Sequence, residues 1–261
     1  MADKIGVCSM IPGWLKTLIL RPASNAAEPG VIAPDQRFIA VGDIHGRMDL
    51  LQSLLDRVDP DCPLVFLGDY VDRGPHSAHV LRHLYKLEQN DNRPVTCLLG
   101  NHEEMLLRFV DEPKRNAQLW MLNGGLQTIA SFGLGDLDGA AIGRDAEGAA
   151  TRLREAMGDA LLDWLRARPL TWTSGNVTAV HAALDPNRAV TRQQRQTCLW
   201  GHPEFPKTVR QDGHWVLRGH VIVDKPDASN GVISIDTGAV FTGRLTAADI
   251  SSKGVHYIST S

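Results

Sequence analysis

The sequence predicts an α/β fold in which two β-sheets form a sandwich flanked by helices. In the N-terminal half, short apolar runs alternate with amphipathic segments, the pattern of βαβ units. Each of three polar, glycine-bounded motifs follows one of these apolar runs. The motifs are therefore expected at the carboxyl ends of the strands, where a parallel sheet binds its ligands. After residue 170 the apolar residues alternate with period two, which predicts a second, largely antiparallel sheet.

The expected elements of the first sheet begin at Phe38. Leucines at four positions of Met48–Val58 form one apolar helical face. The predicted strands are residues 38–41, 64–67 and 95–99, and the predicted helices are residues 48–58, 77–89 and 103–110. Helices of this length between strands imply right-handed crossovers and parallel pairing.

The remaining elements follow in order. Asp111–Asp159 contains a Gly- and Ala-rich stretch and predicts a less regular insertion or cap over the site. Leu153–Arg168 predicts one amphipathic helix ended by Pro169. The second sheet is expected to contain strands at residues 170–173, 177–180, 215–217, 231–235, 245–250 and 255–258.

Length and composition predict a flexible segment at residues 1–37 and one folded domain at residues 38–261. Met10–Leu20 is apolar but contains a lysine, and it is shorter than the roughly 20 residues that span a bilayer. The net charge of −3 indicates neither a nucleic-acid surface nor an anionic-membrane surface. Four scattered cysteines without Cys-x-x-Cys spacing favour reduced thiols, so a cytoplasmic location is expected and the oligomeric state stays open.

Three motifs supply residue types that bind metals. They read Gly42-Asp43-Ile44-His45-Gly46, Gly68-Asp69-Tyr70-Val71-Asp72-Arg73-Gly74 and Gly100-Asn101-His102-Glu103. A carboxylate beside an imidazole suits Mn, Fe or Zn better than Mg or Ca, which prefer oxygen ligands. Asp69 could bridge two metals, and the strand-end histidines His181 and His220 could complete the second site.

Together these motifs resemble the phosphoprotein phosphatase family of metallophosphoesterases, the Ser/Thr-phosphatase type, especially its compact bacterial and phage members. The resemblance covers about Phe38–Ile250 and implies a calcineurin-like metallophosphoesterase fold. It implies one metal held by Asp43, His45 and Asp69, and a second held by Asp69, Asn101, His181 and His220. Manganese is the expected metal, with iron and zinc as alternatives.

The same resemblance assigns the catalytic roles. His102 is expected to act as general acid oriented by Asp72, and Arg73 to bind the phosphate. The expected activity is a protein phosphatase that hydrolyses phosphoserine, phosphothreonine or phosphotyrosine through a hydroxide bridging two metals. The alternative is a dinucleoside-polyphosphate hydrolase of the diadenosine tetraphosphate type. A metal-binding regulatory module without turnover is a third possibility.

One departure from the family concerns a second phosphate-binding arginine. Related sequences place one between the last two ligand histidines, whereas this chain reads Leu199-Trp200-Gly201-His202-Pro203-Glu204-Phe205 there. The sequence leaves three substitutes open, which are Arg195, Arg210 and Arg218. Arg218 lies two residues before His220, so on one strand the two side chains would share a face.

Overall fold

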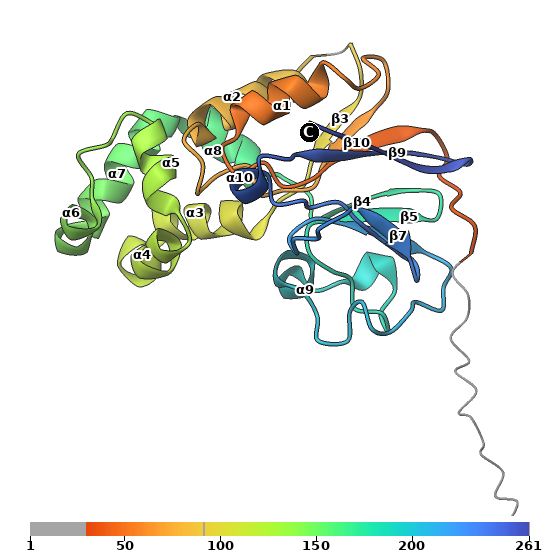
Figure 1. The fold of residues 1–261 in the computed structure, drawn as a ribbon. Helices are drawn as coiled ribbons and strands as arrows, with labels where there is room; N and C mark the ends of the chain where they lie inside the picture. Colours follow the sequence, from red (N-terminus) through yellow and green to blue (C-terminus); the bar gives the residue numbers. More distant parts are fainter. Residues whose placement is uncertain (1–29, 91, 261) are drawn as a thin grey trace, which may run out of the picture.

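The computed structural model describes residues 30–90 and 92–260, which form two five-stranded sheets with helices around them (Figure 1). The first sheet has the order β10-β9-β1-β2-β3 and the second β4-β5-β6-β8-β7. The strands are β1 Phe38–Val41, β2 Leu64–Phe66, β3 Val95–Cys97, β4 Thr171–Ser174, β5 Val177–Val180, β6 Trp215–Arg218, β7 Asp227–Ser229, β8 Val232–Ser234, β9 Thr246–Ser251 and β10 Gly254–Ser259. The predicted sandwich flanked by helices is confirmed.

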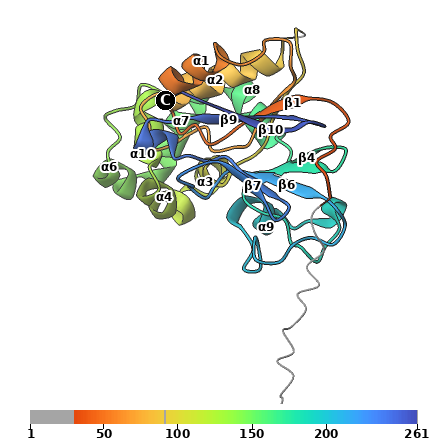
Figure 2. The same cartoon turned by 45° about the vertical axis from the view of Figure 1, so that its right-hand side comes forward.

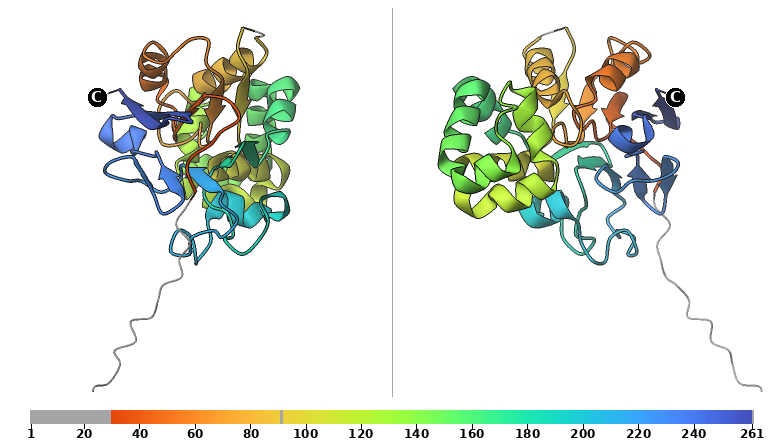
Figure 3. Two further views of the ribbon diagram at one scale, coloured as in Figure 1. Left: turned by 90° about the vertical axis from the view of Figure 1, so that its right-hand side faces the viewer. Right: turned by 60° about the vertical axis from the view of Figure 1, so that its left-hand side comes forward.

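Most of the helices cover the first sheet or build a lobe at one side of the sandwich, whereas α9 lies beside the second sheet (Figures 1 and 3). They are α1 Met48–Leu55, α2 Ser77–Glu88, α3 Asn101–Asp111, α4 Pro113–Leu122, α5 Gly125–Ser131, α6 Gly139–Arg144, α7 Ala146–Met157, α8 Asp159–Arg166, α9 Arg195–Trp200 and α10 Ala239–Thr242, with a 3-10 turn at Val190–Arg192. Among the described residues, no helix is both long and apolar enough to cross a membrane.

Strand β1 shows how the apolar pattern produces the layers. Side chains of a strand point alternately to opposite faces. Ile39 and Val41 therefore pack among the helices, while Phe38 and Ala40 enter the core between the two sheets. A third apolar cluster, which includes Phe205, covers the outer face of the second sheet. All four residues of β1 are fully buried, as expected for a strand covered on both sides.

The parallel pairing of β1, β2 and β3 confirms the βαβ prediction. The assignment of the later strands is partly wrong. β9 and β10 join the first sheet, where β9 pairs antiparallel with β1. The second sheet is not largely antiparallel, because β5, β6 and β8 pair in parallel. The long connection from β5 to β6 returns the chain to the same end of the sheet, which a hairpin cannot do.

The helical lobe corrects two further predictions. Most of Asp111–Asp159 is helical, and it is more regular than its glycine content suggests. Asp138 and Asp145 start α6 and α7 by accepting hydrogen bonds from backbone N–H groups at 2.7 and 2.8 Å. Leu153–Arg168 is not one helix, because the positive φ of Gly158, 79°, separates α7 from α8.

The prediction of a flexible segment at residues 1–37 can be compared with the structure only for residues 30–37. Residues 1–29, with Cys8 and Met10–Leu20, lie outside the described residues. Residues 30–37 hydrogen-bond to the second sheet, where Asn176 Oδ1 accepts from Ala33 N at 2.7 Å and Gly30 O accepts from Trp215 Nε1 at 2.6 Å.

Candidate metal centre

The three motifs form adjoining loops at the carboxyl ends of β1, β2 and β3. The backbone N–H groups of Ile44 and His45 both donate to Asp69 O, at 3.0 and 2.9 Å, which joins the first loop to the second. Gly68, with φ of 100°, lets the second loop touch the third, because a Cβ there would lie 2.7 Å from Gly100 N. The parallel sheet thus gathers the motifs as predicted.

Glu103 anchors these loops from the first turn of α3. This helix begins at Asn101, two residues earlier than predicted. The fully buried carboxylate of Glu103 accepts four backbone hydrogen bonds, from residues 69, 70, 71 and 100, at 2.7 to 3.2 Å. Burial raises its pKa, to about 8, but these donors favour the ionised form. Glu103 belongs to the third motif, but the motif pattern alone assigns it no role.

Two groups of ligand atoms meet at Asp69. One group contains His45, Asp69 and His102, and the other contains Asp69, His181 and His220. Asn101 joins the second group, because its Oδ1 lies 2.8 Å from His181 Nε2 and 3.1 Å from His220 Nδ1. The shared position of Asp69 matches the bridging ligand expected from the sequence.

The spacing within the second group fits a metal ion. His181 Nδ1 donates to Leu67 O at 2.9 Å, so its Nε2 carries a free lone pair. That atom also lies 3.3 Å from Asp69 Oδ1 and 3.2 Å from His220 Nδ1. Ligands about 2.1 Å from a metal stand about 3.0 to 3.4 Å apart in octahedral or tetrahedral geometry. Electron-rich atoms at these distances are suited to a cation between them.

The histidines of the site fall into two electrostatic classes. Burial lowers the pKa of His45 to about 3 and that of His220 to about 4, and it also lowers the pKa of His181. All three are therefore neutral imidazoles, the form that binds metals. Burial would also lower the pKa of His102, but the carboxylates of Asp69 and Asp72 outweigh it and raise the value. His102 is thus suited to carry a proton.

Asp43 is placed differently from the other expected ligands. It is not among the side chains gathered in either group, and both of its carboxylate oxygens accept from His220 N, at 3.2 and 3.1 Å. Burial raises its pKa well above the usual range, with further contributions from the charges of Asp236 and Asp69. Neighbouring buried carboxylates require compensating cations, which two divalent metals would supply.

Asp236 is a buried carboxylate whose role the sequence analysis missed. It follows β8 as the motif aspartates follow β1 and β2, so the same strand-end signal was present. Its Oδ1 accepts from Gly238 N at 2.8 Å, and burial raises its pKa to about 6.

The His102–Asp72 pair is held by the helical lobe. Asp72 Oδ2 lies 2.7 Å from His102 Nδ1, which leaves His102 Nε2 facing Asp69 at 3.9 Å. Trp120 Nε1 donates to both oxygens of Asp72, at 3.0 and 2.9 Å, and Thr128 Oγ1 donates to Oδ1 at 2.7 Å. Because α4 and α5 supply these donors, the expected cap fixes the orientation of the pair.

Arg73 points at the same centre. Its Nη1 donates to His45 Nε2 at 2.9 Å, and its guanidinium lies 5.7 Å from the ring of the exposed Phe241. Gly124, in the segment Asn123-Gly124-Gly125, allows the close approach of Arg73, because a Cβ there would lie 2.7 Å from Arg73 N. The backbone of Arg73 donates to Gly124 O at 3.2 Å.

Backbone strain is concentrated in the same loops. Six non-glycine residues among those described have positive φ, and five of them belong to the site, which are His45, Asp69, Asp72, Arg73 and His220. Such conformations cost about 1–3 kcal/mol each and persist where the surroundings enforce them. The fold therefore holds these side chains in place at the expense of local stability.

The three candidate arginines have different surroundings. Arg210 is buried and donates to Asp185 O and Arg188 O, at 2.8 Å each, so it holds a loop. Arg195 donates to Glu104 at 2.9 Å. Arg218, only 8% exposed, lines a pocket of about 360 Å³ together with His220. Of the three, Arg218 is the one that shares a pocket with an expected metal ligand.

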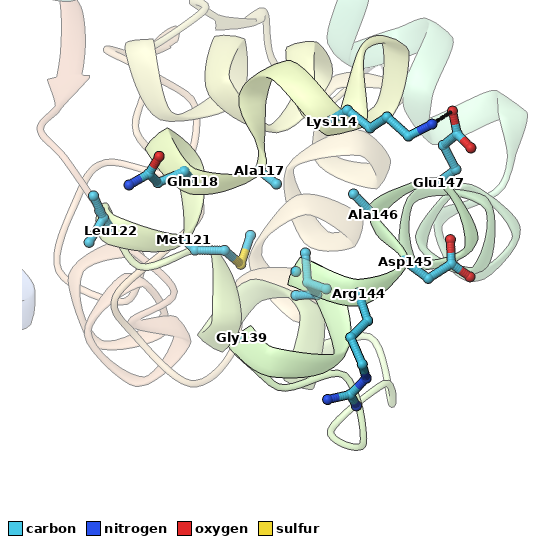
Figure 4. Close-up of a pocket in the computed structure, with 12 residues that line it drawn as sticks. Lys114, Ala117, Gln118, Met121, Leu122, Gly139, Arg144, Asp145, Ala146 and Glu147 are labelled. Atoms are coloured by element: carbon cyan, nitrogen blue, oxygen red, sulfur yellow. Dashed lines mark ion pairs between the residues drawn. The ribbon is translucent and has the colours of Figure 1, made fainter.

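A larger pocket of about 600 Å³ lies in the helical lobe (Figure 4). Residues of α4, α6 and α7 line it, and a Lys114–Glu147 ion pair of 2.9 Å crosses its rim. It contains none of the motif residues, so the metal centre and this pocket are separate features.

The family model described as calcineurin-like phosphoesterase matches residues 36–224, well over half of the chain. The chain belongs to this family. A calcineurin-like phosphoesterase is a metal-dependent hydrolase, which agrees with the two ligand groups around Asp69. The family and fold expected from the motifs are therefore confirmed.

Two bacterial relatives of this calcineurin-like phosphoesterase hydrolyse nucleotides according to their names. The asymmetrical bis(5'-nucleosyl)-tetraphosphatase PrpE of Bacillus velezensis is 30% identical over 79% of this chain and 86% of its own length. The symmetrical bis(5'-nucleosyl)-tetraphosphatase of Pseudomonas syringae pv. tomato is 30% identical over 62% of this chain and 46% of its own length.

A solved structure supports the fold alone. A cold-active protein-tyrosine phosphatase of Shewanella sp. superposes with a TM-score of 0.52 at 19% identity, covering 88% of this chain and 83% of that chain.

Proposed function

We propose that this chain hydrolyses dinucleoside polyphosphates, with a dinucleoside tetraphosphate as its substrate. The observation that carries the proposal is the pair of ligand groups that share Asp69, which is suited to two divalent metals. The nucleotide substrate is supported by the PrpE relative, which aligns with most of both chains. This alternative now has better support than the phosphoprotein substrate, which stood first in the sequence analysis.

The ligands expected from the sequence would hold two metals. Asp43, His45 and Asp69 would hold one, and Asp69, Asn101, His181 and His220 the other. Manganese remains our choice because imidazole and carboxylate ligands are mixed, with iron and zinc as alternatives. When bound, the metals would neutralise phosphate oxygens and make water nucleophilic at neutral pH.

The protein's own groups would handle the phosphate and the proton. Hydrolysis adds the oxygen of water to one phosphorus atom, while the bridging oxygen leaves with the other nucleotide. His102, oriented through Nδ1 by Asp72, would donate a proton from Nε2 to that leaving oxygen. Arg73 would present its planar guanidinium to the phosphate.

Catalytic efficiency of the Mn²⁺-loaded protein tests the proposal. Diadenosine tetraphosphate should be preferred to phosphoserine, phosphothreonine and phosphotyrosine peptides. Chromatography of the products separates cleavage to ATP and AMP from cleavage to two ADP. An Asp69→Asn variant purified in parallel measures contaminating phosphatase.

Two results would overturn this assignment. A higher efficiency toward a phosphopeptide would make the chain a protein phosphatase. Bound metal without turnover of any of these substrates would leave the non-catalytic metal-binding module.

A further inference from the structure

A pocket of about 360 Å³ opens beside the metal centre. Its lining combines aromatic rings with one guanidinium and includes Trp200, His202, Phe205, Arg218 and His220. His220 belongs to both features, because its Nδ1 lies 3.1 Å from Asn101 Oδ1 while its side chain lines the pocket. A molecule bound at the metals therefore has this pocket as its neighbour.

The indole of Trp200 is held rigidly at the end of α9. Its Nε1 donates to Glu104 Oε2 at 2.9 Å, and the other oxygen of Glu104 accepts from Arg195 at 2.9 Å. Glu104 lies on α3, the helix that also carries Asn101 and His102, and α9 lies near α3 in Figure 2. The ring is thereby fixed relative to the catalytic groups.

Arg218 and Phe205 form another part of the lining. Arg218 Nε donates to Ser234 Oγ at 3.0 Å, and its guanidinium lies 5.3 Å from the centre of the Phe205 ring. Both side chains are at least nine-tenths buried. The buried guanidinium stays charged, so an anion bound beside it would offset the cost of burying that charge.

We propose that this pocket binds the nucleoside at one end of the dinucleoside polyphosphate, with Arg218 contacting the phosphate chain; the proposal rests on the function proposed above. Aromatic side chains recognise unpaired bases by stacking, and arginine binds phosphate through its planar fork. Pockets for small molecules have volumes of about 300–1,000 Å³, so this one has room for one nucleoside.

The test compares a dinucleoside polyphosphate with a phosphate ester that contains no nucleoside. For the full-length, Mn²⁺-loaded protein, we take the ratio of kcat/KM on diadenosine tetraphosphate to kcat/KM on p-nitrophenyl phosphate. In Trp200→Ala the ratio should fall about tenfold, mainly through a higher KM, within the range expected for a lost base stack. Trp200→Phe, which keeps an aromatic face, should recover most of the ratio.

A matched control removes an indole from the second sheet, outside the pocket. Trp172 on β4 packs edge-to-face on Phe38 with ring centres 4.7 Å apart, so Trp172→Ala should leave the ratio at the wild-type value. Thermal melting of both alanine variants shows whether each is folded. An equal fall of the ratio in both variants would refute the pocket, because the effect would then be general.

Inhibition of p-nitrophenyl phosphate hydrolysis separates the two proposals. AMP should inhibit the wild type more strongly than inorganic phosphate, and this advantage should shrink about tenfold in Trp200→Ala. If the tetraphosphate is not cleaved but the AMP advantage is present, the proposed function fails and the nucleoside pocket stands. If the tetraphosphate is cleaved and Trp200→Ala leaves the ratio unchanged, the pocket fails. If Trp200→Ala instead lowers kcat/KM toward a phosphopeptide, the pocket binds a peptide side chain.

Discussion

Replacing Thr128 with valine removes a hydroxyl that contacts Asp72 twice, while nearly preserving side-chain shape. Thr128 Oγ1 donates to Asp72 Oδ1 at 2.7 Å and accepts from Asp72 N at 2.8 Å. Asp72 would keep its contacts with His102 and with Trp120. The substitution therefore loosens the carboxylate that orients His102 without removing either member of the pair.

The size of the effect follows from these contacts. A buried hydrogen bond to a charged group contributes about 1.5–3 kcal/mol, so we expect a loss of about 2 kcal/mol in the free energy of unfolding. The melting temperature of a domain of this size should fall by about 4–8 °C. General acid catalysis contributes about 10²–10⁴-fold, and partial loss of orientation should lower kcat about tenfold, or ~1.4 kcal/mol.

The assay uses two substrates with different leaving groups. Phenyl phosphate releases a basic phenoxide that needs a proton, whereas p-nitrophenyl phosphate releases a much weaker base. In Thr128→Val, kcat should fall about tenfold for the first substrate and much less for the second, with KM nearly unchanged for both.

Ser131→Ala is the matched control on the same helix. Its hydroxyl accepts from Ala78 N at 3.0 Å and donates to Thr128 O at 2.7 Å, without touching Asp72. It should lower stability but leave the leaving-group dependence as in the wild type. Identical leaving-group dependence in Thr128→Val and Ser131→Ala would refute the reasoning.

Three further predictions concern the same site. His102→Asn should lower kcat on phenyl phosphate by about 10²–10⁴-fold while elemental analysis still finds the bound metal, and surviving turnover would contradict its role as general acid. Gly124→Ala should displace Arg73 and raise the KM for phosphorylated substrates, because the added methyl would meet Arg73 N at 2.7 Å; an unchanged KM would exclude this packing. Glu104→Gln should lower unfolding stability by about 1.5–3 kcal/mol at neutral pH. Burial favours the neutral form of Glu104, but hydrogen bonds from Trp200 and Arg195 outweigh burial and lower the pKa of this carboxyl. The stability that the ionised Glu104 contributes is therefore fully present above the ordinary carboxyl pKa. It is lost as the pH falls through the lower pKa of the folded state. Chemical denaturation at pH 7 and below pH 4 checks that the difference between Glu104→Gln and wild type shrinks in acid.

Local sequence patterns determined the strands and helices around the motifs. In β1 the apolar run, the following glycine and the Asp43–His45 pair are all adjacent in sequence. Parallel strands end at one edge of a sheet, so the sequence could also place the three motifs together. The expected ligands His181 and His220 likewise follow strands β5 and β6.

The same patterns could not determine which sheet a strand joins. The alternation of apolar residues in β9 indicates that one or both faces of the strand are buried. It does not indicate that the neighbouring strand is β1, about 200 residues earlier. The helical regularity of the lobe was missed for a related reason. Two of its helices, α6 and α7, begin with aspartate caps whose hydrogen bonds are local, but the Gly- and Ala-rich composition hides the apolar face with which the lobe packs on α3.

The sequence by itself thus determined the metal-binding residue types and their common edge of the sheet. Only the tertiary structure decided what supports them. Trp120 and Thr128 reach Asp72 from 48 and 56 residues away, and Arg218 becomes buried against Phe205 rather than exposed on its strand. Periodicity and motif spacing describe contacts within a few residues, whereas these contacts depend on how whole helices and strands pack across the site.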